Sequence, residues 1–390
     1  MMTVMVFLGV AVILLAYANG ANDNFKGVAT LSGSGSTDYR KALVLATATT
    51  FLGSLTALYI GEGLVTTFSG KGLVPDSAIQ DPSFLFAVGA GAAGTVLIAT
   101  RLGFPVSTTH AIMGALVGAG LVATGGGIRW AGLGEKFLLP LLASPFLALI
   151  ISSGLSIIAS RFPLVFGIPR DACMCAGREK LMAVASKVSG VQLIEIEGYP
   201  SATLGTSVEC LNRYGHHSIR LNTRAVVNRV HYLSAGAVSF ARGLNDTPKI
   251  VALMTAAHIM DVPTALFVVG IAIALGGLIS SRRVADTMSF RITEMDHSAG
   301  FTANLVTAFL VIFASRWGMP VSTTHVSCGS LFGIGLINGS VWGNARWKTV
   351  GRIILAWVTT LLLAAILSGL AVILTSTIIT SLSCRVPSFA

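Results

Sequence analysis

The sequence has few charged residues. They make up 11% of its 390 residues, whereas roughly 25% is usual for a soluble domain. A soluble protein of this length could not cover its surface with so few charges, and 53% of the residues are hydrophobic. This composition excludes a water-soluble globular domain and predicts a protein that lies in a lipid bilayer.

Acidic residues are scarcer than basic ones, and the formal net charge is +10. Most of the Lys and Arg residues lie between apolar stretches, and the sequence has no polybasic run with interleaved aromatic residues. We therefore assign the positive charge to contact with an anionic membrane surface, and we expect no nucleic-acid partner.

Cysteine is also scarce, with five residues spread along the chain. Their number and spacing exclude a disulfide framework of the kind found in small secreted domains. Cys173, Cys175 and Cys210, with His216 and His217, form a candidate zinc site, but a CxC spacing is wrong for the common zinc sites. We expect no zinc there, and no organic cofactor.

Long apolar runs are abundant, and several have about 18 residues, enough for a helix to cross a bilayer of roughly 30 Å. A polar stretch with basic residues near both ends separates two groups of runs, which favours a cytoplasmic position for it. We divide the chain into a first membrane repeat (1–160), a cytoplasmic loop segment (161–231) and a second membrane repeat (232–390). The runs lie at 3–20, 43–60, 84–100, 108–124, 137–160, 232–256, 263–280, 299–315, 321–338 and 350–380.

Within the loop segment, two stretches have the composition of helices. They are EKLMAVASKV at 179–188 and RAVVNRVHYL at 224–233. We predict a helix at each and assign no chemistry to this segment.

The two apolar halves are related in sequence. Residues 99–121 and 314–336 are identical at 14 of 23 positions and share PVSTTH whole, and GANDNFKGVATL at 20–31 matches GLNDTPKIVALM at 243–254. Repeats in a polytopic membrane protein indicate a transporter with its site at the repeat interface. The predicted fold is an all-α polytopic membrane protein of two inverted-topology repeats, with broken or re-entrant helices and a cytoplasmic loop domain between them.

Each PVSTTH motif predicts a helix break followed by a new helix. Pro105 and Pro320 disfavour helix in the preceding residue, and a serine two residues after each can cap the next helix. Hydroxyls and unpaired N–H groups at a helix start make a donor-rich oxyanion site, and two of them could surround a tetrahedral phosphate. The alternative is that these residues only cap and pack broken helices. The predicted phosphate ligands are Ser107, Thr108, Thr109, Ser322, Thr323 and Thr324.

Two Asn–Asp pairs lie in or at the end of apolar runs, where an acidic residue is costly and indicates function. Their oxygens suit a small hard cation such as Na⁺, and the predicted Na⁺ ligands are Asn22, Asp23, Asn245 and Asp246.

In the second copy, Pro248 should free the carbonyl of Leu244 as a further cation ligand in a broken helix. Lys26 and Lys249 follow the acids by three residues, on the same helical face. They either draw in the anion or only neutralise the acids.

His110 and His325, which end the two PVSTTH motifs, are interpreted first as partners of a neighbouring helix rather than as ligands or proton carriers. No acidic residue stands near them in sequence to orient them, which argues against a membrane enzyme acting on phospholipid phosphate. We expect a protein that is not an enzyme.

These motifs resemble the inorganic phosphate transporter family, the type that couples phosphate to sodium or protons. The resemblance rests on GANDNFKGVA, on GLNDTPKIVAL after HYLSAGAVSFAR, and on both PVSTTH blocks. It implies an inverted repeat with phosphate between the PVSTTH elements, cations near the Asn–Asp pairs, termini outside, the large loop inside, and a homodimer. The first signature departs from the family's ANDVAN-like sequence.

Import of an anion into a cell that is negative inside requires coupling, since each negative charge costs about 2.3 kcal/mol per 100 mV. Co-transported cations reverse that cost and neutralise the anion in a low dielectric. We predict phosphate import by Na⁺ symport at the plasma (inner) membrane. The alternatives are proton-coupled phosphate symport, then a sulfate or other oxyanion permease, and a channel.

Overall fold

The computed structural model describes residues 2–166, 172–187, 190–215, 219–290, 297–337 and 344–383. They form two compact units. The first consists of Met1–Leu155 and Tyr232–Ala390, and the second of Ser156–His231. The candidate site lies in the first unit.

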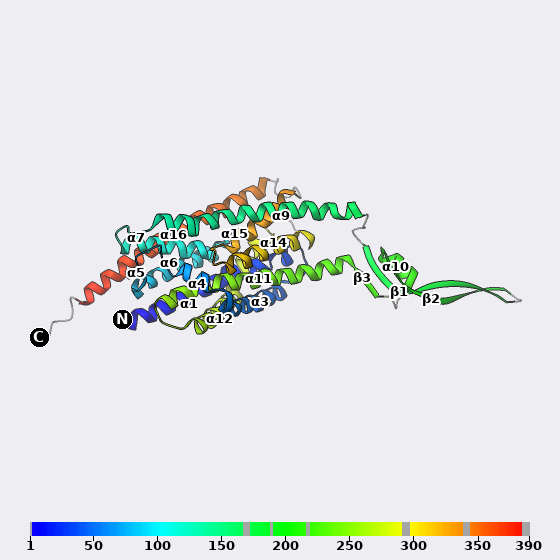
Figure 1. Ribbon diagram of the computed structural model, residues 1–390, viewed down its shortest axis with the longest axis horizontal. Helices are drawn as coiled ribbons and strands as arrows, with labels where there is room; N and C mark the ends of the chain where they lie inside the picture. The colour runs from blue at the N-terminus through cyan, green and yellow to red at the C-terminus, as the bar shows by residue number, and fades with distance from the viewer. Residues whose placement is uncertain are drawn as a thin grey trace. The chain divides into compact units, whose positions relative to one another are not determined.

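The first unit is built from helices that run side by side (Figure 1). Its N-terminal half contains α1 (Met2–Asp23), the 3₁₀ turn η1 (Asn24–Gly27), α2 (Ala29–Gly33), α3 (Tyr39–Ile60), α4 (Glu62–Phe68), α5 (Asp76–Ile79), α6 (Pro82–Arg101), α7 (Thr108–Ala123), α8 (Trp130–Leu133), the π turn η2 (Gly134–Leu138) and α9 (Leu139–Phe166). Its C-terminal half contains α11 (Thr223–Ala256), α12 (Val262–Ser280), α13 (Arg282–Phe290), α14 (His297–Arg316), α15 (Thr323–Ile337) and α16 (Asn344–Ser383). Residues 156–166 of α9 and 223–231 of α11 belong to the second unit.

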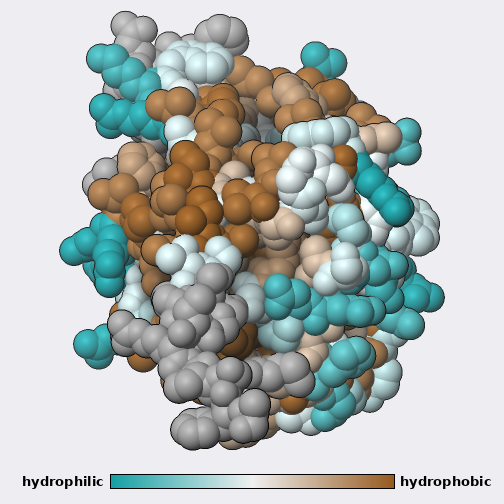
Figure 2. Space-filling model, turned by 90° about the vertical axis from the view of Figure 1, so that its left-hand side faces the viewer, coloured by the Kyte–Doolittle hydropathy of each residue, from teal (hydrophilic) through white to brown (hydrophobic). Residues whose placement is uncertain are grey.

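Among the described residues, seven helical stretches are long and apolar enough to cross a membrane, and α7 and α15 are shorter apolar helices. Large apolar side chains are exposed on the outer helices, among them Phe7, Ile150 and Leu362. Figure 2, seen along the long axis of Figure 1, shows hydrophobic residues (brown) gathered on the visible face with hydrophilic ones (teal) around them. The prediction of a helical, polytopic membrane protein is confirmed.

Helices in this unit approach one another closely at glycines. Gly20 of α1 faces the carbonyl of Ile273 in α12, and Gly118 of α7 faces that of Ala365 in α16. A Cβ at either glycine would collide with that backbone oxygen. Membrane helices pack in this way because lipid supplies no hydrophobic driving force and close van der Waals contact replaces it.

The second unit contains a small antiparallel sheet, which the all-α prediction did not foresee. Its strands are β1 (Ala172–Lys187), β2 (Gly190–Thr206) and β3 (Ile219–Asn222), in the order β2-β1-β3, with helix α10 (Ser207–Tyr214) after β2. The helix expected at 179–188 is wrong, since β1 pairs with β2 through Lys187↔Gly190. Packing between the two strands outweighs the helical composition of this stretch. The helix expected at 224–233 is confirmed within α11.

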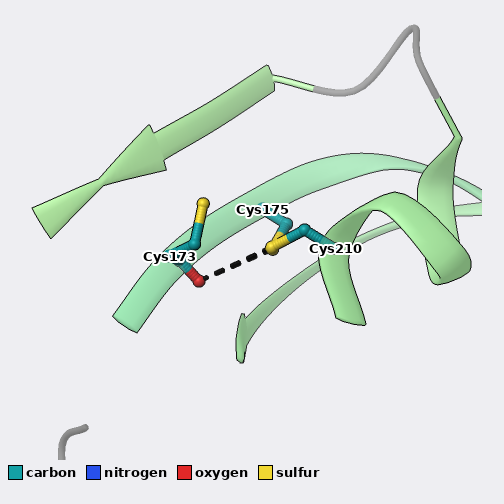
Figure 3. A group of neighbouring side chains, drawn as sticks. All are labelled: Cys173, Cys175 and Cys210. Atoms are coloured by element: carbon teal, nitrogen blue, oxygen red, sulfur yellow. Dashed lines mark hydrogen bonds between the residues drawn. A yellow bond between two sulfur atoms is a disulfide. The ribbon is translucent and has the colours of Figure 1, made fainter. Parts of the chain in front are cut away.

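Three buried cysteines meet in the second unit (Figure 3). Cys173 and Cys175 lie on one face of β1, and Cys210 lies on α10. Their sulfur atoms are within 4.8 Å of one another, and Cys175 and Cys210 form a disulfide that joins α10 to the sheet. His216 and His217 of the zinc hypothesis lie outside the described residues.

Candidate functional site

Each PVSTTH motif spans the end of a helix break and the start of a new helix, as predicted. Helix α6 ends at Arg101 and α7 begins at Thr108, while α14 ends at Arg316 and α15 begins at Thr323. Gly103 and Gly318 have φ values of 73° and 65° in these breaks, a conformation that favours glycine. The repeated Gly and Pro therefore set both breaks.

A serine caps each new helix. The Ser107 hydroxyl accepts from the backbone N–H of His110 at 3.2 Å, and the Ser322 hydroxyl accepts from that of His325 at the same distance. Both serines are buried. As acceptors in these caps, the hydroxyls keep their own hydrogens available to another acceptor.

The two Asn–Asp segments differ in backbone form. Helix α1 ends at Asp23 and continues as the 3₁₀ turn η1, whereas α11 runs on through Asn245, Asp246 and Pro248. The broken helix predicted at the second copy is therefore wrong, and the break lies in the first. Membrane helices tolerate an internal proline because neighbouring groups compensate for the lost hydrogen bond.

The side chains of these segments reach the PVSTTH breaks. Lys26 Nζ donates to Asp23 Oδ1 at 2.5 Å, to the Val106 carbonyl at 2.6 Å and to Thr324 Oγ1 at 2.6 Å. Thr324 Oγ1 donates in turn to the Val106 carbonyl at 2.9 Å. Lys26 thus joins an acid and a carbonyl of its own repeat to a hydroxyl of the other.

Lys249 makes the equivalent contacts from the second repeat. Its Nζ donates to the Val321 carbonyl at 2.7 Å, to Thr109 Oγ1 at 2.8 Å and to Asp246 Oδ1 at 3.4 Å. Thr109 Oγ1 donates to the Val321 carbonyl at 3.3 Å. Because these residues match those around Lys26 in the sequence repeats, the two halves exchange the same contacts.

The two asparagines fasten the Asn–Asp segments to the breaks. Asn22 Oδ1 accepts from the Val106 N–H at 3.0 Å, and its Nδ2 donates to Thr100 Oγ1 at 2.9 Å. Asn245 Oδ1 accepts from Ser315 Oγ at 3.1 Å, and its Nδ2 donates to the Val321 carbonyl at 3.2 Å. Each asparagine therefore fastens the start of a PVSTTH motif to the segment that carries the neighbouring aspartate.

Sequence reasoning missed two residues of this cluster. Asn19 donates to Asp23 Oδ2 at 3.1 Å, to Asp246 Oδ2 at 3.3 Å and to Thr108 Oγ1 at 3.0 Å. Arg242, 1% exposed, donates to Asn19 Oδ1 at 3.5 Å, and its Nε has no partner among the described residues. The sequence repeat could have indicated both residues, because Asn19 and Arg242 occupy equivalent positions, one residue before each aligned segment.

The histidines after the threonines are buried side by side. The ring centroids of His110 and His325 are 4.4 Å apart, and the His325 ring lies 3.8 Å from that of Trp357. His110 Nδ1 and His325 Nε2 have no hydrogen-bond partner in the described part of the chain. Thr323, the remaining predicted ligand, is also buried.

The cluster is polar, enclosed and positive in formal charge. Lys26, Arg242 and Lys249 are cationic, whereas Asp23 and Asp246 are anionic, and all five are buried. Buried charges interact far more strongly than exposed ones because little water screens them. An anion would balance the surplus positive charge, and a cation could approach only beside the carboxylates.

Comparison with known proteins identifies the family. Residues 19–368 match the model of the phosphate transporter family. A Pyrococcus furiosus protein named "Putative phosphate permease PF1020" is 30% identical over 91% of this chain and 92% of its own length. The "Inorganic phosphate transporter 2-1, chloroplastic" of Arabidopsis thaliana is 28% identical over 91% of this chain and 69% of its own.

One solved structure, titled "The sodium-dependent phosphate transporter", has the same fold. It aligns with a TM-score of 0.73 and 22% identity, covering 96% of this chain and all of that one. With the family match, these findings show that the chain belongs to the phosphate transporter family, whose members are membrane permeases and not enzymes.

Proposed function

We propose that this member of the phosphate transporter family imports inorganic phosphate by symport with Na⁺. Phosphate binds between the starts of α7 and α15, and the cations bind near the two Asn–Asp pairs. One observation carries the proposal: both repeated motifs of both halves meet in a single buried cluster. The phosphate ligands are Ser107, Thr108, Thr109, Ser322, Thr323 and Thr324, and the cation ligands are Asn22, Asp23, Asn245 and Asp246.

Hydrogen-bond donors at the cluster support the proposed phosphate site. Two helix N-termini lie at the cluster, and helix starts favour anions through their unpaired N–H groups and dipole. The hydroxyls of Ser107 and Ser322 retain hydrogens to donate, and two lysines reach the same breaks. Together they supply charge-assisted hydrogen bonds, which are the stronger kind.

The cation half rests on the two buried acids. Asp23 and Asp246 offer carboxylate oxygens in a site that also holds backbone carbonyls of the breaks, the hard ligand set that Na⁺ prefers. The solved transporter of the same fold is titled sodium-dependent, which supports Na⁺ as the first candidate.

A second candidate is coupling to protons. The observation that favours it is the buried pair His110 and His325, whose rings are 4.4 Å apart and which have nitrogens without partners among the described residues. Histidine is the side chain whose charge changes most readily near neutral pH. A proton held between the rings would supply the coupling charge in place of Na⁺.

The proposal includes a membrane arrangement, which the resemblance to the family implies. The protein spans the plasma (inner) membrane as two inverted repeats, with both termini outside, the segment 161–231 in the cytoplasm, and two copies forming a homodimer. Basic residues at the ends of that segment, such as Arg161 and Arg229, support a cytoplasmic position.

Radiolabelled phosphate uptake into proteoliposomes tests the function. Uptake is measured with and without an inward Na⁺ gradient at fixed pH, and again with excess sulfate. The proposal expects saturable uptake that needs Na⁺ and resists sulfate. Uptake driven equally by a pH gradient without Na⁺ would establish the proton-coupled candidate, and the absence of phosphate uptake would contradict both.

A further inference from the structure

Lys26 and Lys249 lie where the two proposed sites touch. An ammonium group has three hydrogens to donate, and each lysine uses all three on a carboxylate, a backbone carbonyl and a threonine hydroxyl. The carboxylate belongs to the proposed cation site, and the hydroxyls of Thr324 and Thr109 belong to the proposed phosphate site. A short movement of Nζ can therefore carry each positive charge from one site to the other.

In the observed arrangement each site is closed to its own ligand. Asp23 Oδ1 is occupied by Lys26 at 2.5 Å, and Asp246 Oδ1 by Lys249 at 3.4 Å. A Na⁺ at either carboxylate would lie beside an ammonium group in a low dielectric, which is repulsive. A phosphate that took the ammonium alone would leave a buried carboxylate without a partner, which is also costly.

Neither the repulsion between Na⁺ and ammonium nor the unpaired carboxylate arises when both ligands bind together. Phosphate accepts the ammonium groups, Na⁺ takes the released carboxylates, and every buried charge keeps an opposite partner. Val106 and Val321 help, because their carbonyls already face the ammonium groups and can face a cation in their place. Each ligand then favours the other, which is the thermodynamic meaning of coupling.

We propose that Lys26 and Lys249 exchange partners during transport, each leaving its aspartate for phosphate and so opening the carboxylate to Na⁺. The inference rests on the proposed function and deepens it, since it makes these lysines the link between the two sites. It explains why the acids are paired with lysines and not left as open cation ligands.

Equilibrium binding to the purified full-length protein tests the exchange. Binding of ²²Na⁺ is measured with and without phosphate, and binding of ³²P-phosphate with and without Na⁺. In the unsubstituted protein, each ligand should tighten the other by the same factor, about tenfold or more. The substitutions Lys26→Met and Lys249→Met should tighten Na⁺ binding in the absence of phosphate and reduce that factor toward one.

The chain offers a matched control. Lys41 pairs with Asp38 at the same three-residue spacing, 3.2 Å apart, but the pair is exposed, so Lys41→Met should leave both affinities unchanged. If a single lysine variant does not fold, the double variant Asp23→Asn with Lys26→Met removes both charges and leaves the net charge of the site unchanged. It should bind phosphate with less dependence on Na⁺.

The outcomes separate the two proposals. Lysine variants that keep the full mutual tightening of Na⁺ and phosphate would overturn the exchange while leaving Na⁺ symport intact. An unsubstituted protein that binds and takes up phosphate with no response to Na⁺ would overturn Na⁺ symport. The exchange, which couples Na⁺ to phosphate, would be overturned with it.

Discussion

The two repeats of this transporter provide the same parts but are not copies. Lys26 and Lys249 each contact an aspartate, a valine carbonyl of their own repeat and a threonine of the other. The first repeat, however, breaks its helix after Asp23, whereas α11 continues through its Asn–Asp pair. Where the first repeat has a neutral asparagine, Asn19, the second has Arg242.

Some residues of the site are therefore present in both repeats, and others are present in one repeat alone. Each shared lysine pairs with an aspartate of its own repeat and donates to a threonine of the other, so either half is incomplete without the other. Of the residues that differ, Arg242 alone carries a charge, and it supplies the surplus positive charge of the cluster. We therefore expect substitutions at shared positions to act alike in both repeats, and substitutions at the differing position to act in one.

The largest expected effect is loss of a buried acid. Asp23→Asn and Asp246→Asn each leave a buried lysine without its carboxylate, and removing one partner of such a pair costs about 3–5 kcal/mol. Both variants should unfold at markedly lower temperature and lose Na⁺-dependent uptake. Thermal unfolding in detergent and uptake into proteoliposomes measure this.

Two further variants sharpen this prediction. Asp23→Asn with Lys26→Met should recover most of the lost stability, because no buried charge is left alone. Asp38→Asn, in the exposed pair, should change stability and uptake little. Normal Na⁺-dependent uptake by either Asp23→Asn or Asp246→Asn would show that its acid holds no coupling cation.

The next effect tests the asymmetry. Arg242→Asn gives the second repeat the residue of the first and removes the surplus charge. A hydrogen bond from a charged donor contributes about 1.5–3 kcal/mol, so the KM for phosphate should rise about tenfold or more with folding intact. Asn19→Ala should raise it less. Equal effects of the two substitutions would contradict a special role for the arginine.

A smaller effect is expected at the helix starts. Ser107→Ala and Ser322→Ala each remove a cap, which typically costs about 1 kcal/mol. Because each cap bond measures 3.2 Å, the two losses of stability should be similar. Phosphate uptake should fall further than stability does, and most in the double variant. Uptake that falls only in proportion to stability would indicate a capping role alone.

The smallest effect concerns two exposed caps outside the site. Asp38 caps α3 by accepting from the Lys41 N–H, and Asp261 caps α12 by accepting from the Thr264 N–H. These backbone hydrogen bonds hold the pKa of each carboxyl below its ordinary value of 3.8. The stability they contribute is present above that value and is lost as pH falls through the lowered pKa.

Asp38→Ala and Asp261→Ala should therefore lower Tm slightly at pH 7 and not at a pH below both pKa values. Thermal unfolding at the two pH values provides the comparison. An equal drop in Tm at both would show that the caps stabilise through packing and not through charge.

The breaks were predictable because their causes are local. Glycine and proline recur together before each serine, and the combination disfavours helix at that point. Sequence identity between the two halves revealed the repeats, and the length and composition of the apolar runs indicated membrane helices. These signals gave the membrane helices, both helix starts, and the acids and lysines that meet near them.

The contacts across the repeats were not predictable from local signals. The sequence placed Lys26 beside Asp23, but its bond to Thr324 spans 298 positions and depends on how the halves pack. Arg242 was missed because it precedes the repeated segment and its equivalent in the first repeat, Asn19, is a different residue type. The sheet was missed because residues 179–188 have the composition of a helix, and strand propensity depends on the packing of the partner strand. The continuity of α11 was missed because neighbouring groups can compensate for the hydrogen bond that Pro248 removes.

The most direct test of the proposed phosphate site is to locate the bound anion. Crystals of the full-length protein grown with Na⁺ and arsenate, a tetrahedral analogue of phosphate, would show arsenic by anomalous diffraction. We expect a peak between the starts of α7 and α15, within hydrogen-bond reach of Ser107 and Ser322. A peak elsewhere in the membrane unit, with these serines contacting only their own helices, would contradict it.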